Sequence, residues 1–457
     1  MEKQVVVLGA GISGLAAAYW LHKDGIEPFI LESKPEPGGA IESLHQNGFM
    51  YDRGPNSGME TTPLISQLAE ETGIKDEMVY ANSAGDKRYI LRDGVLKPLP
   101  MGPKDIIFSD LFSVAGKLRL FAEPFIGKSE DGYYQSVSQF VRRRLGQEFL
   151  DYAINPFVSG VYAGNPDDLS VKSAFPKLYR LEEVYGGLIK GMIKGAKERK
   201  KSAEKSKQSA KMFSFKKGMQ ELPNAIAAKL KDRIEYGASI ESVSKSGPTY
   251  KITYTQNGEK KTVETKVILS AMPAYIAAKV FAGMDGVLSN HMESIFYPPV
   301  MTVYACYDKA AIGRPLDGFG FLIPEKEKQP FLGAIWTSVL FPERTTEGTA
   351  SFTLFIGGAR NRQVLTMKED EIIKPALKNF EKIMNIGKKP VYLNNKFWPL
   401  AIPQYNIGYI EHEKYFDHFE KENKGIILSG NYRGGIALGD CVKNSRLAAD
   451  KALELLK

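Results

Sequence analysis

A glycine-rich turn close to the start of the chain constrains its fold more than any other feature. Residues 4–9 (QVVVLG) have the β-branched composition of a buried parallel strand, and GAGISG at 9–14 leads from it into an alanine- and leucine-rich helix that stops at Gly25. Residues 27–32 (EPFILE) predict a second strand. This strand–helix–strand unit of about thirty residues predicts a parallel, nucleotide-binding core.

The residue types of this turn suit the diphosphate of a dinucleotide. Gly9 permits the tight turn, Gly11 lets the backbone approach a pyrophosphate, and Gly14 lets helix and strand pack closely. Glu32 would accept hydrogen bonds from a ribose 2′-hydroxyl, and its negative charge disfavours the 2′-phosphate of NADP. The predicted contacts of this part are Gly9, Ala10, Gly11, Ile12, Ser13, Gly14, Glu32 and Ser33.

Two further glycine-containing segments follow at spacings typical of large FAD enzymes. In such enzymes a glycine pair soon after the second strand lines the diphosphate, and Gly38-Gly39 stands there. Ala40 follows the pair where amine oxidases usually have an arginine, so one phosphate contact of that subfamily is missing. The GPNS segment at 54–57, preceded by Tyr51-Asp52, resembles the segment that passes the flavin in protoporphyrinogen oxidases. The predicted contacts are Gly39, Ala40, Gly54, Pro55, Asn56 and Ser57.

A second strand-to-helix junction lies near the C-terminus. A strand at 426–428 leads through Gly430 and Gly434-Gly435 into a helix, and such a junction offers backbone N–H groups to a flavin ring. This junction favours FAD over NAD. Cys441 lies beyond the glycines; we expect a buried structural cysteine and non-covalent FAD, with a flavin thioether as the alternative. The predicted contacts are Gly430, Ile436, Ala437 and Leu438.

Composition excludes several classes of function. The 457 residues carry 61 basic and 53 acidic side chains, and Lys190–Lys217 alone holds eleven Lys or Arg against two Glu, so a dispersed nucleic-acid surface is not expected. Two cysteines exclude a disulfide framework, and the five histidines form no metal-binding pattern. The uncharged stretch Gln4–Leu21 contains the motif glycines, which argues against a membrane span. Lys197–Lys211 is predicted to be a mobile loop or frayed helix.

The remaining pattern predicts an α+β / α/β fold around the parallel core. Residues 87–98 predict a hairpin turning at Asp93-Gly94, and 105–200 are mostly helix-like, with a break at PFVSGVYAGNP. Further strands are expected at 234–243, 249–255, 261–270, 299–307, 319–323, 331–339 and 350–357, and helices at 61–73, 368–385 and 443–456.

Taken together, these motifs resemble the protoporphyrinogen/coproporphyrinogen oxidase family, FAD enzymes of haem biosynthesis. The SGVYAG and AIPQY blocks are distinctive for porphyrinogen oxidases within the wider amine-oxidase-like group, whereas Asn444-Ser445 replaces a common Ser-Gly. The resemblance runs almost end to end, through 9–14, 54–57, 155–178, 213–226, 297–300, 317–324, 398–405 and 430–442.

The resemblance implies three parts. A discontinuous Rossmann-type FAD domain would use 1–84, 215–290 and 398–457. A mixed-sheet substrate domain would use 85–100 and 291–397, and a helical domain at 101–214 would rest on a membrane. For the Lys-rich stretch, a contact with an anionic leaflet and a solvated loop both stay open.

The resemblance also implies a reaction and its partners. A porphyrinogen would lose six electrons to become a porphyrin, by hydride transfer from methylene-bridge carbons to the flavin, with O2 as acceptor and H2O2 as product. The flavin carries this chemistry, so no acid–base residue is expected. The SGVYAG–FPKL block favours protoporphyrinogen IX, with coproporphyrinogen III as the alternative. A ferrochelatase and the inner face of the cell membrane are hypothetical partners of a cytoplasmic enzyme.

The implied substrate residues follow the same resemblance. Arg88 would pair with a propionate, since guanidinium binds carboxylate well. Leu316, Leu332 and Phe352 would sandwich the macrocycle, and the Gly164 carbonyl would face its pyrroles. Trp398 and Gln404 would lie beside the flavin, and Ile240 would offer backbone contacts to adenine.

Two competing interpretations remain at this point. One is an amine oxidase or carotenoid-desaturase-like flavoenzyme, against which Ala40 and the SGVYAG block speak. The other is a flavin-free protein-binding module, like the GDP dissociation inhibitors, against which the complete C-terminal glycine junction speaks.

Overall fold

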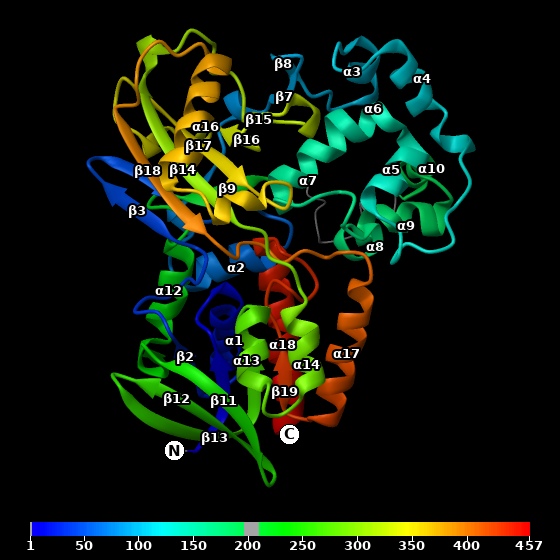
Figure 1. Ribbon diagram of the computed structural model, residues 1–457. Coiled ribbons are helices and arrows are strands. Elements are labelled where there is room, and N and C mark those ends of the chain that lie inside the picture. Colours follow the sequence, from blue (N-terminus) through cyan, green and yellow to red (C-terminus); the bar gives the residue numbers. More distant parts are fainter. Residues whose placement is uncertain (1, 196–209) are drawn as a thin grey trace.

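The computed structural model describes residues 2–195 and 210–457, which form two large sheets and a helical region (Figure 1). The first sheet and both chain ends lie in the lower half of the view, the second sheet at the upper left and the helical region at the upper right. The predicted loop or frayed helix at Lys197–Lys211 lies outside the described residues, apart from 210 and 211.

The first sheet is the predicted parallel core extended by an antiparallel meander. Its order is β10-β2-β1-β13-β12-β11, with β19 paired to β13. The pairings among β10, β2, β1, β13 and β19 are parallel, and those joining β11, β12 and β13 are antiparallel. The strands are β1 (Glu2–Leu8), β2 (Pro28–Glu32), β10 (Ile234–Tyr236), β11 (Ser239–Ser246), β12 (Thr249–Gln256), β13 (Glu259–Ser270) and β19 (Ile426–Leu428).

Helices cover both faces of this sheet. Val5 and Val7 pack into a cluster with α1 and α18, whereas Val6 and Leu8 face the opposite cluster, because successive strand side chains alternate. Helix α1 lies beside α18, and its alanines allow close approach. The covering helices are α1 (Ile12–Lys23), α12 (Glu221–Lys229) and α18 (Leu438–Leu456) on one face, and α13 (Ala274–Phe281), α14 (Gly286–Glu293) and α17 (Tyr409–Glu422) on the other.

The second sheet has the order β18-β14-β17-β16-β15-β7-β8. Its outer face is apolar and packs on α16 (Glu369–Met384) through Phe380, whereas its inner face carries polar residues and glycines. The strands are β7 (Arg88–Arg92), β8 (Val95–Pro98), β14 (Val300–Asp308), β15 (Gly320–Leu322), β16 (Gly333–Ile335), β17 (Thr349–Gly357) and β18 (Tyr392–Trp398).

Short elements connect the two sheets. A hairpin, β3 (Ser43–Gln46) and β4 (Phe49–Asp52), and a three-stranded sheet, β5 (Gly58–Met59), β6 (Met78–Tyr80) and β9 (Met212–Phe215), lie with α2 (Pro63–Glu71) between them. Helix α15 (Thr337–Leu340) follows β16.

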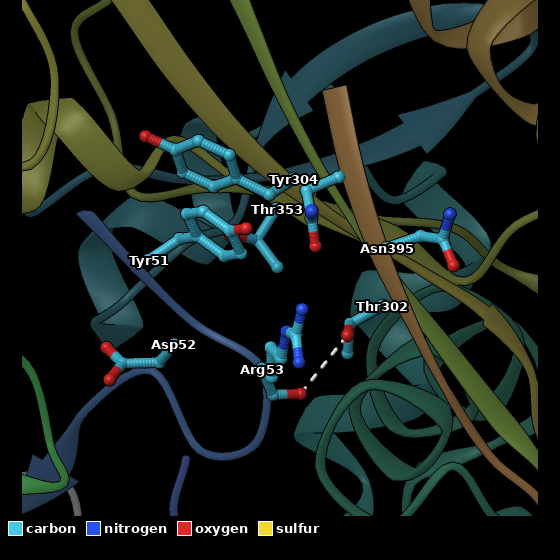
Figure 2. Close-up of a pocket in the computed structure, with 8 residues that line it drawn as sticks. Tyr51, Asp52, Arg53, Thr302, Tyr304, Thr353 and Asn395 are labelled. Carbon is cyan, nitrogen blue, oxygen red and sulfur yellow. Dashed lines mark hydrogen bonds between the residues drawn. The ribbon is translucent and has the colours of Figure 1, made fainter. Parts of the chain in front are cut away.

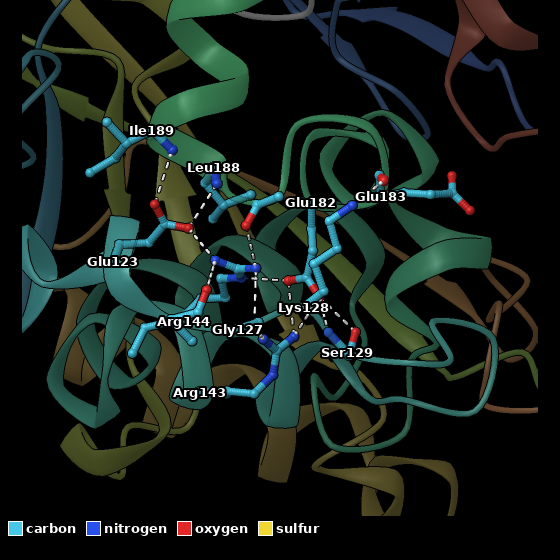
Figure 3. A network of polar contacts seen from close by, with 12 residues as sticks. Glu123, Gly127, Lys128, Ser129, Arg143, Arg144, Glu182, Glu183, Leu188 and Ile189 are labelled. Atoms are coloured by element: carbon cyan, nitrogen blue, oxygen red, sulfur yellow. Dashed lines mark hydrogen bonds and ion pairs between the residues drawn. The ribbon is translucent and has the colours of Figure 1, made fainter.

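The helical region is organised around a buried ion network (Figure 3). Arg144 of α5 and Glu123 are fully buried and Glu182 of α9 is 1% exposed, so their charges compensate each other away from water. Within the described ranges, no helix has both the length and the apolar composition needed to span a bilayer. The helices are α3 (Pro103–Phe108), α4 (Val114–Phe121), α5 (Val137–Leu145), α6 (Gln147–Phe149), α7 (Asn155–Tyr162), α8 (Val171–Ala174), α9 (Pro176–Tyr185) and α10 (Leu188–Lys194).

Several predicted boundaries are wrong. The expected break at PFVSGVYAGNP is instead helix α7 up to Tyr162, because Pro156 occupies its first turn, and the chain turns only at Ala163, with φ +50°. The strand predicted at 234–243 is divided by Gly237, with φ +69°. The strand predicted at 331–339 is only Gly333–Ile335, because the chain then forms α15. The last helix begins at Leu438 rather than at 443.

Candidate active site

The fingerprint turn has the backbone that a dinucleotide diphosphate needs. Gly9 has φ +101°, and a Cβ on Gly14 would overlap the Gly9 carbonyl oxygen. Apart from its chain neighbours and its own helix, no atom of the described residues lies within 4 Å of the position that a Cβ on Gly11 would take, so the space above this residue is open. Gly11 is also the N-cap of α1 and supplies no side-chain hydrogen bond to the first helical N–H groups. An open space at an uncapped helix N-terminus fits a phosphate anion.

Glu32 is held beside this turn by hydrogen bonds to its carboxylate. Oε2 accepts from the Ala10 N–H at 2.7 Å, and Oε1 accepts from the Lys34 N–H at 2.8 Å and from the Ser33 hydroxyl at 3.3 Å. The Glu32 carbonyl accepts from the Ala238 N–H at 2.8 Å, and Ile240 lies two residues further along β11. The structure therefore brings the residues predicted for ribose and adenine to one end of the first sheet.

The other two N-terminal glycine segments pack directly on the turn. Gly38 donates its N–H to the Ala10 carbonyl at 2.9 Å, and a Cβ on Gly39 would lie 3.2 Å from the Gly11 Cα. A Cβ on Gly54 would overlap the Ala40 carbonyl oxygen, so the GPNS segment lies against the glycine pair. Three segments that are separate in sequence thus form one continuous backbone surface.

The C-terminal junction closes this surface. Gly430 and Gly435 have φ +122° and +130°, and Ala437 begins α18 without a side-chain cap. A Cβ on Gly58 would lie 3.0 Å from the Leu438 side chain, so the start of α18 meets the segment after GPNS. Cys441 is buried in α18, and its Sγ lies 3.9 Å from the Gly435 carbonyl. The start of α18 is a second uncapped helix N-terminus facing the same region.

Trp398 and Gln404 connect this surface to the second sheet and to α7. The Trp398 indole N–H donates to the Arg53 carbonyl at 3.0 Å. The Gln404 amide donates to the carbonyls of Tyr162 and Ile402 at 2.8 and 3.0 Å, while its Oε1 is buried with no hydrogen-bond partner among the described residues. A Cβ on Gly164 would overlap this oxygen, so Gln404 and Gly164 are neighbours.

The inner face of the second sheet carries two rows of residues, one of which includes Arg88. Residues paired across adjacent strands share a face, and one such row crosses from β7 to β14. A second row runs parallel to it, two residues along each strand. The first row contains Arg88, Gly320, Ile335, Thr353 and Tyr304, and the second contains Ile90, Leu322, Gly333, Phe355 and Thr302. At about 4.8 Å per strand, the first row spans roughly 14 Å from Arg88 to Thr353.

The predicted substrate residues are distributed unevenly on this sheet. Arg88 is exposed at the end of the first row, with its guanidinium 5.6 Å from the centre of the Phe319 ring. Leu332 lies near Gly358, whose neighbour Ala359 donates its N–H to the Ala163 carbonyl at 2.7 Å. Leu332 and Gly164 are thereby brought together.

Two of the predicted wall residues lie elsewhere. Phe352 is fully buried on the outer face, 5.0 Å from the Phe380 ring centre, so its predicted contact with substrate is wrong. Leu316 packs at the edge of the same outer core. The large apolar residues of β15 and β17 that share the inner face with Arg88 are instead Leu322 and Phe355. The alternation of β17 signals this, because Phe352 and Phe355 differ by an odd number of positions.

A small pocket marks the contact between the segment that includes the end of β4 and the second sheet (Figure 2). It is lined by Tyr51, Asp52, Arg53, Thr302, Tyr304, Thr353, Asn394 and Asn395. The rings of Tyr51 and Tyr304 stack with centres 4.5 Å apart, and burial raises the pKa of both phenols. The Thr302 hydroxyl donates to the Arg53 carbonyl at 3.1 Å. The extended segment that leads into GPNS therefore crosses the inner face of the second sheet.

Comparison with known proteins defines the class. Residues 12–453 match the family model described as flavin containing amine oxidoreductase, and the chain belongs to this family. FAD is therefore its cofactor, and the open space at Gly11 and the two uncapped helix N-termini fit it. This finding also speaks against a flavin-free module.

Two curated relatives and one solved structure show which named proteins this chain is similar to. The chain is 33% identical to "Protoporphyrinogen oxidase 2, chloroplastic/mitochondrial" of Arabidopsis thaliana, over 100% of this chain and 94% of that protein. It is 27% identical to "Coproporphyrinogen III oxidase" of Bacillus subtilis (strain 168), over 100% and 99%. A crystal structure of a candidate protoporphyrinogen oxidase from Exiguobacterium sp. 255-15 shares the fold, with a TM-score of 0.80, 20% identity and 99% of each chain covered.

Proposed function

We propose that this chain oxidises a porphyrinogen to a porphyrin, with protoporphyrinogen IX as the first candidate substrate. The observation that carries the proposal is the inner face of the second sheet, where a row with one cation, a glycine and few bulky side chains lies beside the FAD surface. Such a floor suits a broad apolar macrocycle with carboxylates at its edge. The relatives named for this activity support it.

The residues of the chain bind and orient in this proposal. When bound, FAD would supply the redox chemistry, which is acceptance of hydride from a methylene bridge and electron transfer to O2. Arg88 holds a propionate at one end of the row through a bidentate contact. Gly320 is required by the strand geometry, since its φ is +139° and a Cβ would overlap the Ala334 carbonyl oxygen, and it adds no side chain between Arg88 and Ile335. Gly164 and Gln404 face it from the end of α7.

Coproporphyrinogen III is the second candidate, and one further cation favours it. Arg360 is largely buried, which lowers its pKa, and its guanidinium donates to the Asn155 Oδ1 at 3.1 Å and to the Asn155 carbonyl at 3.4 Å. Glu325 lies 3.5 Å away but is exposed. The Arg360 backbone follows Ala359, which bonds to Ala163, whereas the guanidinium lies at the start of α7, against Asn155. A propionate that protoporphyrinogen lacks would find a counter-charge here.

The test is oxygen-dependent porphyrin fluorescence with both substrates in parallel. Arg88→Leu should lower kcat/KM for both substrates by roughly 10- to 150-fold, the value of one charge-assisted bond of about 1.5–3 kcal/mol. If coproporphyrinogen III is the substrate, Arg360→Leu should lower kcat/KM for coproporphyrinogen III by the same factor. A flavin-loaded protein that oxidises neither porphyrinogen would refute the proposal and direct attention to amines and polyenes.

We also propose that the helical region rests on the inner face of the cell membrane, with the chain itself in the cytoplasm. Phe108 at the end of α3 and Phe125 after α4 are 86% and 89% exposed, and such apolar patches mark interaction sites. Lysines on the same helices suit an anionic leaflet. The other exposed apolar residues of this patch are Met101, Ile107, Val114, Leu118, Phe121, Met192 and Ile193, and its lysines are Lys104, Lys117, Lys190 and Lys194.

Sedimentation with phosphatidylglycerol vesicles tests the membrane contact. The double substitution Phe108→Ser and Phe125→Ser should weaken partitioning at least tenfold, since each buried Phe contributes about 1.5–3 kcal/mol. Val287→Ser on α14, also at an exposed apolar position, is the matched control and should have no effect. Equal binding of all three proteins would refute the membrane surface and leave a ferrochelatase as the candidate partner for this patch.

A further inference from the structure

One buried guanidinium, between α15 and β17, donates a hydrogen bond to the GPNS segment. Arg344 is 1% exposed and follows α15. Its two terminal nitrogens donate to the Asp52 carboxylate, to the Asn56 carbonyl at 3.2 Å, and to the Ser214 hydroxyl of β9. One side chain thus joins the second sheet, the segment beside the FAD surface, and the small sheet between them.

Asp52 and the backbone of Arg344 are themselves fixed. The other carboxylate oxygen of Asp52 accepts from the Met219 N–H at 2.8 Å and from the Ser43 hydroxyl. The Tyr304 hydroxyl donates to the Arg344 carbonyl at 2.7 Å. Neither end of the ion pair can shift without breaking further buried hydrogen bonds.

Asn56 is held a second time, through its side chain. Thr353, in the same row as Arg88, donates its hydroxyl to the Asn56 Oδ1 at 3.1 Å. Because Oδ1 accepts the hydrogen bond from Thr353, the other end of the Asn56 amide must carry the two N–H groups. Among the described residues, the Asn56 Nδ2 donates to the Gly54 carbonyl alone, over a long 3.3 Å, which leaves its second N–H for a ligand.

We propose that Arg344 is a positioning residue for the flavin site: with Thr353 it holds Asn56 so that the Asn56 amide N–H faces the space between FAD and the substrate floor. These contacts join the FAD surface to the first row of the floor through Asn56 and Thr353. The inference rests on FAD as the cofactor and on none of the proposed porphyrinogen substrates. A failure of the proposed substrate therefore leaves it intact.

A purely structural role for Arg344 makes a different prediction, and the chain offers a matched control. Arg144 is also a fully buried, ion-paired arginine, but it lies in the helical region and contacts none of the flavin-site segments. Removing either guanidinium leaves a buried carboxylate uncompensated and lowers stability. Only the loss of Arg344 should change the flavin.

The experiment compares Arg344→Met, Arg344→Lys and Arg144→Met, each purified with FAD. The readouts are the melting temperature, the dissociation constant of FAD from flavin fluorescence, and the visible circular dichroism of the bound flavin. Arg344→Met should weaken FAD binding at least tenfold and alter the visible spectrum, and Arg344→Lys should recover part of both. Arg144→Met should lower the melting temperature while the dissociation constant stays within twofold of the wild-type value.

Two results would overturn the proposal. One is an unchanged flavin spectrum and dissociation constant in Arg344→Met; the other is an equal change in Arg144→Met. If Arg344→Met does not fold, Thr353→Val replaces it, since it removes one hydrogen bond to Asn56 at nearly constant volume. Its flavin spectrum should change, whereas that of Thr353→Ser, which keeps the hydroxyl, should not. An unchanged spectrum in Thr353→Val also refutes the inference.

Discussion

Replacing Arg144 by methionine should destabilise the helical region selectively. The Arg144 guanidinium donates to Glu182, to Glu123 at 2.8 Å, and to the carbonyls of Ile126, Gly127 and Gly186 at 3.0–3.2 Å (Figure 3). No β-sheet of the described residues joins the segments that carry these five acceptors, so the Arg144 side chain connects the segments to one another.

The magnitude follows from the burial of the partners. Breaking a buried ion pair by removing one partner costs about 3–5 kcal/mol, because the remaining charge is left unpaired away from water. Glu123 keeps the N–H groups of Leu188 and Ile189, at 2.7 and 3.1 Å, and Glu182 keeps Arg143 and Ser129. These contacts place the expected loss near the lower end, about 3 kcal/mol, which is roughly a 150-fold change in the unfolding equilibrium.

Hydrogen exchange in the native protein is the appropriate assay, because a chain with several parts need not unfold in one step. Amides of α5, α9 and α10 should exchange roughly 150-fold faster in Arg144→Met, while those of β1 and α1 stay unchanged. The triple substitution Arg144→Met, Glu123→Gln and Glu182→Gln should regain part of the loss, since no charge remains buried. Exchange that is unchanged, or equally fast in both sheets, would refute this account of the network.

Three further outcomes are expected. Gly11→Ala should leave the stability of the FAD-free protein unchanged, because the Cβ meets no atom within 4 Å, yet weaken FAD binding at least tenfold in a fluorescence titration. Phe352→Ala should cost about 3–5 kcal/mol in chemical denaturation with KM unchanged, whereas Phe355→Ala should raise KM with a smaller stability loss; the reverse pattern would contradict the assignment of faces. Burial and the nearby His291 lower the pKa of His412, so the folded state prefers the neutral imidazole. The free energy of unfolding should therefore be full above about pH 6.5 and fall below it. His412→Gln should flatten a profile of melting temperature between about pH 8 and 5. An identical profile for the variant would show that other groups titrate.

The sequence by itself determined the features that depend on neighbouring residues. The turn at 9–14 needs glycine for backbone reasons that any folded context shares, so its strand, turn and helix follow from local chemistry. The family resemblance and FAD follow from such local motifs, each read at its own spacing. Successive side chains of a strand point to opposite faces, so the positions of Phe352 and Phe355 in β17 already predict that they lie on opposite faces of the sheet.

The tertiary structure decided which distant segments meet. No local pattern pairs Arg344 with Asp52, 292 positions away, or aligns Arg88 with Gly320 and Thr353 in one row. Strand register, the outer packing of α16 and the burial of charges depend on the whole hydrophobic core, because a side chain becomes buried only once segments far apart in sequence exclude water together. The rows of residues on the inner face of the second sheet and the hydrogen bonds that hold Asn56 are therefore properties of the fold.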